Sequence, residues 1–348
     1  VMFKEHMTKL TELYPSDKRV HDQWANYYYV LDEYDKAVES YKKVLSLDKE
    51  HAPVYNNLGY IYIAQKKYDE AEKVFKKQIE LIPNRANPYD SYAELLLTIG
   101  KYDESIEQYQ KAYDTENSFS MALSGIGNNY ILKGDFEKAR EYYQKRFDKG
   151  THISAQLTAL YDIANSYIYE GNISKAIESF EVYGNIDKDG NRVANTAYSY
   201  IYRGMVHIEA GDKAQGLANF QKALKISQEA DLPKSIKDNL IIYSKSHECF
   251  GLILSDYLAE AKVKIGELQE LTKDRNSITD EKRFNWLNGV LEWKSQNYND
   301  ALDLLYTAFP EGILNKYYVA KCYKALGEKE KADIKIDELK NWKEIGLH

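Results

Sequence analysis

The chain has 348 residues, of which 44% are hydrophobic and 29% are charged, and its net charge is −7. This length exceeds the roughly 250 to 300 residues at which one hydrophobic core stops growing, so we expect several domains or a linear array. The composition is typical of a folded chain, and no apolar run in the sequence approaches a membrane-spanning length. The negative net charge argues against nucleic acid as a partner.

Residues 1–17 are predicted to form the second helix of a truncated repeat. The sequence repeats with a period of 34 residues from Lys18 onward, and counting back in that register places Val1 about halfway through a copy. We therefore expect further sequence upstream of Val1.

Four regular copies of the repeat are predicted over residues 18–153. In the copy at 52–85, Tyr55, Leu58 and Gly59 fall on one helical face, and Ala71 and Phe75 follow on a second helix. Two antiparallel helices approach closely only where a small side chain faces the partner, and large rings then fill the remaining volume. Equivalent small residues and rings recur in the neighbouring copies: Ala25, Tyr41, Ala93, Tyr109, Gly127 and Tyr143.

Two further residue types predict where the helices of each copy begin and end. Asp35, Asp69 and Asp103 each follow a tyrosine, and we expect them to accept backbone N–H groups at the start of each second helix. Glycines are expected in the left-handed conformation where a first helix ends. These glycines are Gly100, Gly134, Gly171, Gly211 and Gly327.

The spacing loosens after residue 153. Residues 154–230 are predicted to hold two looser repeats, and residues 231–281 a divergent hairpin of two long helices. Residues 282–348 are predicted to hold two C-terminal repeats, and the last helix, 328–342, has the polar outer face of a terminal cap. Cys249 and Cys322 lie in stretches that are predicted to be buried helix faces, so a disulfide framework is not expected.

The copy at 52–85 resembles the consensus of the tetratricopeptide repeat family almost position for position, and the other copies resemble it more loosely. The resemblance implies an all-α fold, a right-handed superhelical solenoid of antiparallel helix pairs, with about eight or nine pairs in this chain. In this family the first helices line a concave groove, where extended peptides or partner helices bind.

The resemblance also implies which residues line that groove. Asn26, Asn128 and Asn165 recur at one repeat position, where side-chain amides can bond an extended peptide through both donor and acceptor. The alternative is that these asparagines only join neighbouring helices. The full set of candidate groove residues is Asn26, Tyr29, Asn57, Tyr60, Glu94, Asn128, Asn165 and Tyr169.

One binding mode of the family, a clamp for a partner's C-terminal carboxylate, is disfavoured. Asn26 and Asn57 match the asparagines of the clamp. Asp22, Asn87 and Ser91 stand where its cations belong, and Asp22 would repel a carboxylate. We therefore expect a neutral or basic segment of a protein or peptide as the partner.

The loop at 185–190 is a weak calcium candidate. Asn185, Asp187 and Asp189 place oxygens at alternate positions before a glycine, as at the start of a calcium-binding loop. Thr196 stands where a bidentate glutamate is expected, so a solvated turn is the plainer interpretation. No metal or other cofactor is therefore predicted.

No catalytic constellation emerges from the sequence. Gly125 and Gly127 lack the third glycine of a dinucleotide fingerprint, and Ser124 lacks the flanking glycines of a hydrolase nucleophile and is expected to be a groove or surface hydroxyl. We predict a protein- or peptide-binding scaffold and not an enzyme. The alternative is a regulatory or sensing repeat array of a larger signalling or transcription-regulating protein. A cytoplasmic and an exported location both stay open, as does the oligomeric state.

Overall fold

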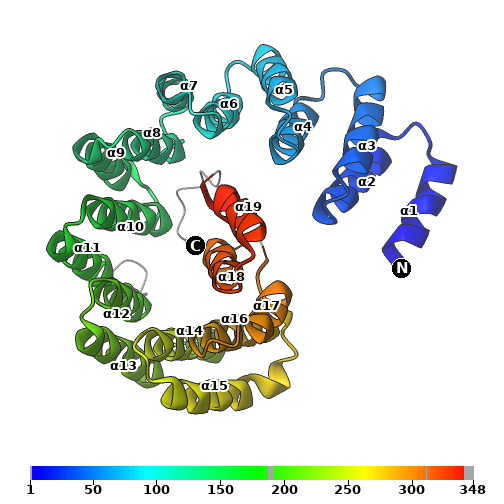
Figure 1. Cartoon of the computed structure of the whole chain (residues 1–348). Coiled ribbons are helices and arrows are strands. Elements are labelled where there is room, and N and C mark those ends of the chain that lie inside the picture. Colours follow the sequence, from blue (N-terminus) through cyan, green and yellow to red (C-terminus); the bar gives the residue numbers. More distant parts are fainter. Residues whose placement is uncertain (1, 187–191, 311, 341–348) are drawn as a thin grey trace. The chain divides into compact units, whose positions relative to one another are not determined.

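The computed structural model describes residues 2–186, 192–310 and 312–340 of the chain. Within those ranges it contains nineteen α-helices, one short 3-10 helix and no strand. Successive helices pack against each other in pairs (Figure 1). The protein is therefore an all-α helical repeat solenoid, as the sequence predicted.

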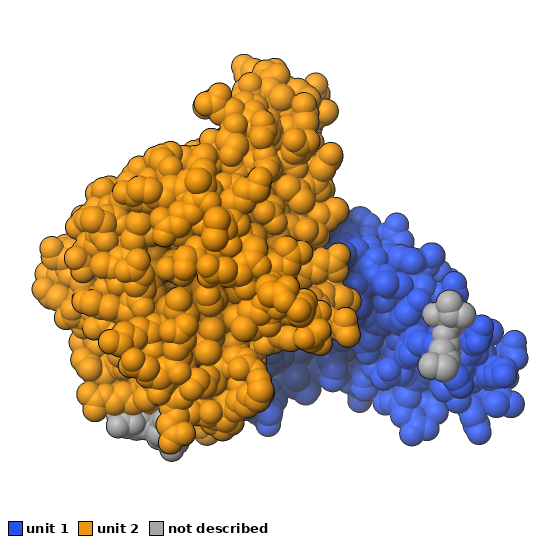
Figure 2. Space-filling view, turned by 90° about the horizontal axis from the view of Figure 1, so that it is seen from below, with its two compact units in different colours: residues 1–150 blue, residues 151–348 orange. Residues whose placement is uncertain are grey.

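The helices divide into two compact units, Val1–Gly150 and Thr151–His348, which Figure 2 shows in separate colours. Unit 1 holds α1 and four helix pairs. Its helices are α1 (Met2–Leu13), α2 (Lys18–Val30), α3 (Tyr34–Leu47), α4 (Ala52–Ala64), α5 (Tyr68–Leu81), α6 (Ala86–Thr98), α7 (Tyr102–Thr115), α8 (Met121–Leu132) and α9 (Phe136–Lys149).

Unit 2 holds five further pairs among its described residues. Its helices are α10 (Ile153–Glu170), α11 (Ile173–Asn185), α12 (Arg192–Glu209), α13 (Lys213–Glu229), α14 (Lys234–Leu254), α15 (Leu258–Thr272), η1 (Lys273–Arg275), α16 (Ile278–Lys294), α17 (Tyr298–Thr307), α18 (Ile313–Ala325) and α19 (Lys329–Lys340). The long helices α14 and α15 correspond to the hairpin expected at 231–281, and α19 to the expected terminal helix. None of the helices described here combines the length and the apolar character that crossing a membrane requires.

Close approach of the two helices in a pair depends on small residues that face large rings. A Cβ atom added to Gly59 would lie 2.3 Å from ring carbons of Phe75, and one added to Gly127 would lie 2.3 Å from the ring of Tyr143. Both rings are almost fully buried, with exposed fractions of 0% and 1%. The rings thus fill the space that the glycines leave, which is the packing that the repeat pattern predicted.

The turn inside each pair contains one residue in the left-handed conformation. The five predicted glycines adopt it, with φ between 77° at Gly134 and 87° at Gly211. The four other turns place a residue with a side chain at the equivalent position, where φ lies between 57° and 70°. Those four residues are Asp32, Lys66, Asp256 and Gln296. The geometry of the turn therefore persists without glycine, at a local conformational cost.

The prediction that Asp35, Asp69 and Asp103 cap the second helices is wrong. α3, α5 and α7 begin at the preceding tyrosine, so each aspartate lies inside the first turn, past the cap position. Asp35 instead accepts a hydrogen bond from Nε2 of Gln65 at 2.9 Å, and Asp103 forms an ion pair with Lys133. The carboxylates still lie near the positive end of the helix dipole, so each stabilises its helix by about 0.3 to 1 kcal/mol.

Cys249 and Cys322 are both buried free thiols, so neither forms a disulfide. Burial raises the pKa of each thiol to about 12. Both side chains belong to the hydrophobic cluster that joins α14 to α18. They therefore act as small apolar residues of the core, as the sequence predicted.

Candidate peptide-binding face

In unit 1, the first helices α4, α6 and α8 lie on the inner side of the arc that the helix pairs form (Figure 1). α6 packs against both α4 and α8, so first helices of successive repeats are direct neighbours there. The repeat period places residues 34 apart at equivalent positions, and Tyr60 and Glu94, with that separation, are hydrogen-bonded. We call the surface formed by the following residues the inner face: Asp22, Asn26, Tyr29, Asn57, Tyr60, Asp90, Glu94 and Asn128.

The hydroxyl of Tyr41 joins two predicted groove amides. It donates to Oδ1 of Asn26 at 2.7 Å and accepts from Nδ2 of Asn57 at 2.9 Å. Burial raises the pKa of Tyr41 to about 12, so the hydroxyl stays a neutral donor and acceptor. The side-chain carbonyl oxygen of Asn57 forms no hydrogen bond with any residue that the structure describes. The two amides line a cavity of about 100 Å³ together with Tyr29, Tyr41 and Tyr60.

A second asparagine–tyrosine pair lies further along the same face. Tyr143 donates to Oδ1 of Asn128 at 2.8 Å. Nδ2 of Asn128 has no hydrogen-bond acceptor among the described residues, so it can donate to a ligand. The two pairs offer opposite hydrogen-bonding groups, a carbonyl oxygen at Asn57 and an N–H at Asn128.

The repeat between the two pairs has an acidic site in place of an asparagine. Tyr60 donates to Oε2 of Glu94 at 2.5 Å, and its hydroxyl lies 3.1 Å from Oγ of Ser91. Asp90, one helical turn before Glu94, is 7% exposed. Burial, and then repulsion by Glu94, raise the pKa of Asp90 to about 7. Burial and Glu94 also hold the pKa of Tyr60 well above its ordinary value.

The repeat pattern predicted Tyr41 only as a ring that fills the core, and not as part of this site. A signal was present in the sequence. Tyr41, Tyr109 and Tyr143 carry a hydroxyl at the repeat position where Phe75 carries none. At two of these tyrosines, the structure shows the hydroxyl holding a first-helix asparagine.

Tyr29 and Tyr169 present their rings to solvent, with exposed fractions of 43% and 45%. Asn165, by contrast, is only 7% exposed, and its side chain hydrogen-bonds the hydroxyl of Tyr161 within α10. The amide of Asn165 therefore offers little to a partner, unlike those of Asn57 and Asn128. Tyr169 and Asn165 belong to unit 2, whereas the inner face is a surface of unit 1.

The sequence also singled out Ser124 and a calcium candidate. Ser124 stands at the repeat position of Asp22 and Asp90, but it is only 8% exposed and its hydroxyl accepts a hydrogen bond from Arg146, so the expectation of a surface hydroxyl is wrong. The calcium candidate Asn185 is the last residue of α11, while Asp187 and Asp189 lie outside the described residues. The described part of the chain contains no cluster of three or more His, Cys, Asp or Glu side chains that could hold a metal ion.

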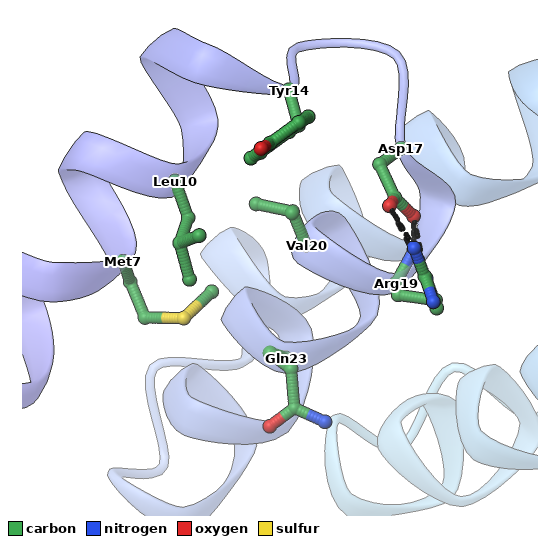
Figure 3. A pocket seen from close by; sticks show the side chains of 7 residues that line it. All are labelled: Met7, Leu10, Tyr14, Asp17, Arg19, Val20 and Gln23. Atoms are coloured by element: carbon green, nitrogen blue, oxygen red, sulfur yellow. Dashed lines mark hydrogen bonds and ion pairs between the residues drawn. The ribbon is translucent and has the colours of Figure 1, made fainter.

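A separate cavity of about 420 Å³ lies between α1 and α2 (Figure 3). Its walls include the apolar side chains of Met7, Leu10 and Val20. Asp17 and Arg19 form an ion pair at its edge, with Nη2 and Oδ2 2.6 Å apart. The mainly apolar lining differs from the amide and carboxylate chemistry of the inner face, and we assign this cavity no role in binding.

Comparison with known proteins identifies the repeats of unit 1. Residues 50–115 and 93–150 match two families described as "Tetratricopeptide repeat", and residues 25–66 match a family described as "TPR repeat". These matches run without a gap from residue 25 to residue 150. The chain therefore contains tetratricopeptide repeats over residues 25–150.

Several solved structures match parts of this chain. PilF of Pseudomonas aeruginosa is 13% identical, with a TM-score of 0.44, over 61% of this chain and 93% of that one. The C-terminal part of a TPR repeat-containing protein from Cytophaga hutchinsonii is 18% identical, with a TM-score of 0.42, over 75% and 98%. YrrB, described as a TPR protein with an unusual peptide-binding site, is 21% identical, with a TM-score of 0.37, over 50% and 89%. A comparison with curated proteins finds no match.

Proposed function

We propose that the inner face of unit 1 binds an extended protein segment of neutral or basic character. Tetratricopeptide repeats support a protein-interaction scaffold in general, and proteins with this fold are generally non-catalytic. The observation that carries the proposal is the Tyr41 bridge. One buried hydroxyl fixes the orientation of Asn26 and Asn57 beside a cavity and beside the exposed ring of Tyr29.

The oriented amides suit the backbone of an extended segment. Such a segment presents N–H and C=O groups in alternation, and the inner face offers an acceptor at Asn57 and a donor at Asn128. Because Tyr41 and Tyr143 hold the asparagine side chains in place, binding orders few additional rotamers. The ring of Tyr29 adds rigid aromatic area of the kind that dominates binding energies.

The charge of the inner face favours a neutral or basic partner. Asp22, Asp90 and Glu94 lie on it, and Asp22 accepts a hydrogen bond from Nδ2 of Asn26 at 3.2 Å. An acidic segment or a free C-terminal carboxylate would bring like charges together. Because each hydrogen bond contributes only about 0.5 to 1.5 kcal/mol net, we expect a dissociation constant of about 1 to 100 µM.

The proposal can be tested without a known partner. Random dodecapeptides displayed on phage are selected against the full chain, and the dissociation constants of the selected peptides are then measured by fluorescence anisotropy. We expect the double substitution Tyr29→Ala with Asn57→Ala to weaken binding at least about 10-fold, because it removes the exposed ring and one oriented amide. Tyr257→Ala is the matched control, since Tyr257 is a 54% exposed tyrosine far along the chain at the start of α15.

Two results would contradict the proposal. One is that the selection yields no specific peptide. The other is that the selected peptides bind the double variant and the Tyr257→Ala variant equally well. Circular dichroism of each variant before the titration shows whether the helices are intact.

A further inference from the structure

We propose that Asp90 and Glu94 bind one cationic side chain, a lysine or an arginine, of the segment on the inner face, an inference that rests on the function proposed above. The two carboxylates lie four residues apart on α6. Side chains at that spacing share one face of a helix, with about 5 to 6 Å between their Cβ atoms. A single ammonium or guanidinium group can therefore contact both carboxylates.

Asp90 is a buried carboxylate that the protein itself leaves uncompensated. It is 7% exposed, and no donor or cation contacts it among the residues that the structure describes. A buried carboxylate is ordinarily paired or hydrogen-bonded, because removing an unpaired charge from water is costly. Its carboxylate oxygens are not fully enclosed, so they retain contact with solvent. A cation from outside the chain can therefore reach them.

The surroundings of Asp90 are arranged to receive a side chain. The Tyr60 hydroxyl donates to Oε2 of Glu94, which fixes the orientation of the second carboxylate. The ring of Tyr60 packs edge-on against Phe75, with ring centroids 5.6 Å apart, and this contact holds it in place. A rigid aromatic wall beside two carboxylates matches both parts of a lysine or arginine, the alkyl stem and the charged end.

A metal ion fits the site less well than a cationic side chain. Calcium takes six to eight oxygen ligands, and the described part of the chain supplies two carboxylates here, Asp90 and Glu94. Within the described ranges, no third acidic, histidine or cysteine side chain completes a metal-binding group. The neighbouring oxygens belong to the hydroxyls of Tyr60 and Ser91, which bond to each other or to Glu94.

The test uses the phage-selected peptides on the full chain. The probes are synthetic, N-acetylated and C-amidated versions of a selected peptide, one with its basic residue intact and one with that residue changed to glutamine. Each is titrated calorimetrically against the unmodified protein, the Asp90→Asn variant and the Asp69→Asn variant. Asp69→Asn is the matched control, because it makes the same change of charge at an exposed position on α5.

We expect the selected peptides to share a lysine or arginine at one position. Changing that basic residue to glutamine should weaken binding to the unmodified protein about 10- to 100-fold, as expected for loss of a charge-assisted hydrogen bond. The same change should weaken binding to the Asp90→Asn variant less than about 3-fold. The Asp69→Asn variant should behave like the unmodified protein. Exchanging lysine and arginine in the probe shows which of the two side chains the site prefers.

The outcomes separate this inference from the proposed function. Peptides that depend on Tyr29 and Asn57 but share no basic residue would overturn the inference and leave the proposed function standing. Equal effects of the glutamine change in the unmodified protein and in Asp90→Asn would also overturn it. A selection without specific binders, or binders indifferent to Tyr29 and Asn57, would overturn both.

Discussion

Replacing Asp90 with asparagine should raise the free energy of unfolding at neutral and alkaline pH. The pKa of Asp90 is raised from 3.8 to about 7, first by burial and then by Glu94, so ionisation of this group opposes folding. Between those two values the folded protein holds a proton that the unfolded chain has released. The contribution of Asp90 to the free energy of unfolding is therefore most favourable below about pH 4 and falls as the pH rises to about 7.

The magnitude follows from the two pKa values. Their difference corresponds to at most about 4 kcal/mol above pH 7. Water that enters the inner face reduces the cost of ionising Asp90. We therefore expect Asp90→Asn to raise the free energy of unfolding by about 1 to 2 kcal/mol at pH 8. The other titratable groups that face Asp90 are Glu94 on the same helix, Tyr60 on α4 and Tyr109 on α7. The two tyrosines stay neutral over this range, because their pKa values are raised further by burial.

The assay is urea unfolding, followed by circular dichroism, at pH values from 4 to 8. The difference in midpoint between Asp90→Asn and the unmodified protein should be large at pH 8 and vanish towards pH 4. Asp69→Asn provides the baseline for a change of charge at an exposed site. If Asp90→Asn is no more stable at pH 8, or if the difference does not change with pH, then Asp90 is not an uncompensated buried carboxylate.

Four further substitutions test the packing, the bridge and the turns. Ala71→Leu should lower the free energy of unfolding by about 1 to 3 kcal/mol, measured by urea titration, because Ala71 is fully buried between the helices of its pair. Tyr41→Phe should cost about 1 to 2 kcal/mol in the same assay, since the ring still fits but both amides lose their shared partner. Gly134→Ala should lower the thermal midpoint and Lys66→Gly should raise it, because both positions have φ above 50°. If the thermal midpoints of Gly134→Ala and Lys66→Gly both equal that of the unmodified protein, the turn conformation carries no strain.

The 34-residue period was sufficient to predict most of the fold. It fixed which residues are small and which are rings, so Gly59 against Phe75 and Gly127 against Tyr143 could be expected from sequence. It did not fix where each second helix begins. The helices start at the tyrosine and not at the aspartate after it, because the left-handed turn residue is followed by a single N-cap residue, such as Glu33.

The candidate site was less predictable than the fold. Repeat position alone placed Asn26, Asn57 and Asn128 on one face of unit 1, but it did not show that buried tyrosines orient them. Position also failed to distinguish Asn128 from Asn165, whose amide bonds within its own helix. Hydrogen bonds of this kind depend on rotamers and on neighbouring helices, which a period cannot specify.

Photo-crosslinking of a bound peptide tests the central claim most directly. A selected dodecapeptide that carries benzoylphenylalanine at one position is bound to the full chain and irradiated, and the modified protein residues are located by mass spectrometry. Our account predicts crosslinks on α2, α4, α6 and α8, among residues around Tyr29, Asn57 and Asn128. Crosslinks confined to the second helices α3, α5, α7 and α9, or to the α1–α2 cavity, would contradict it.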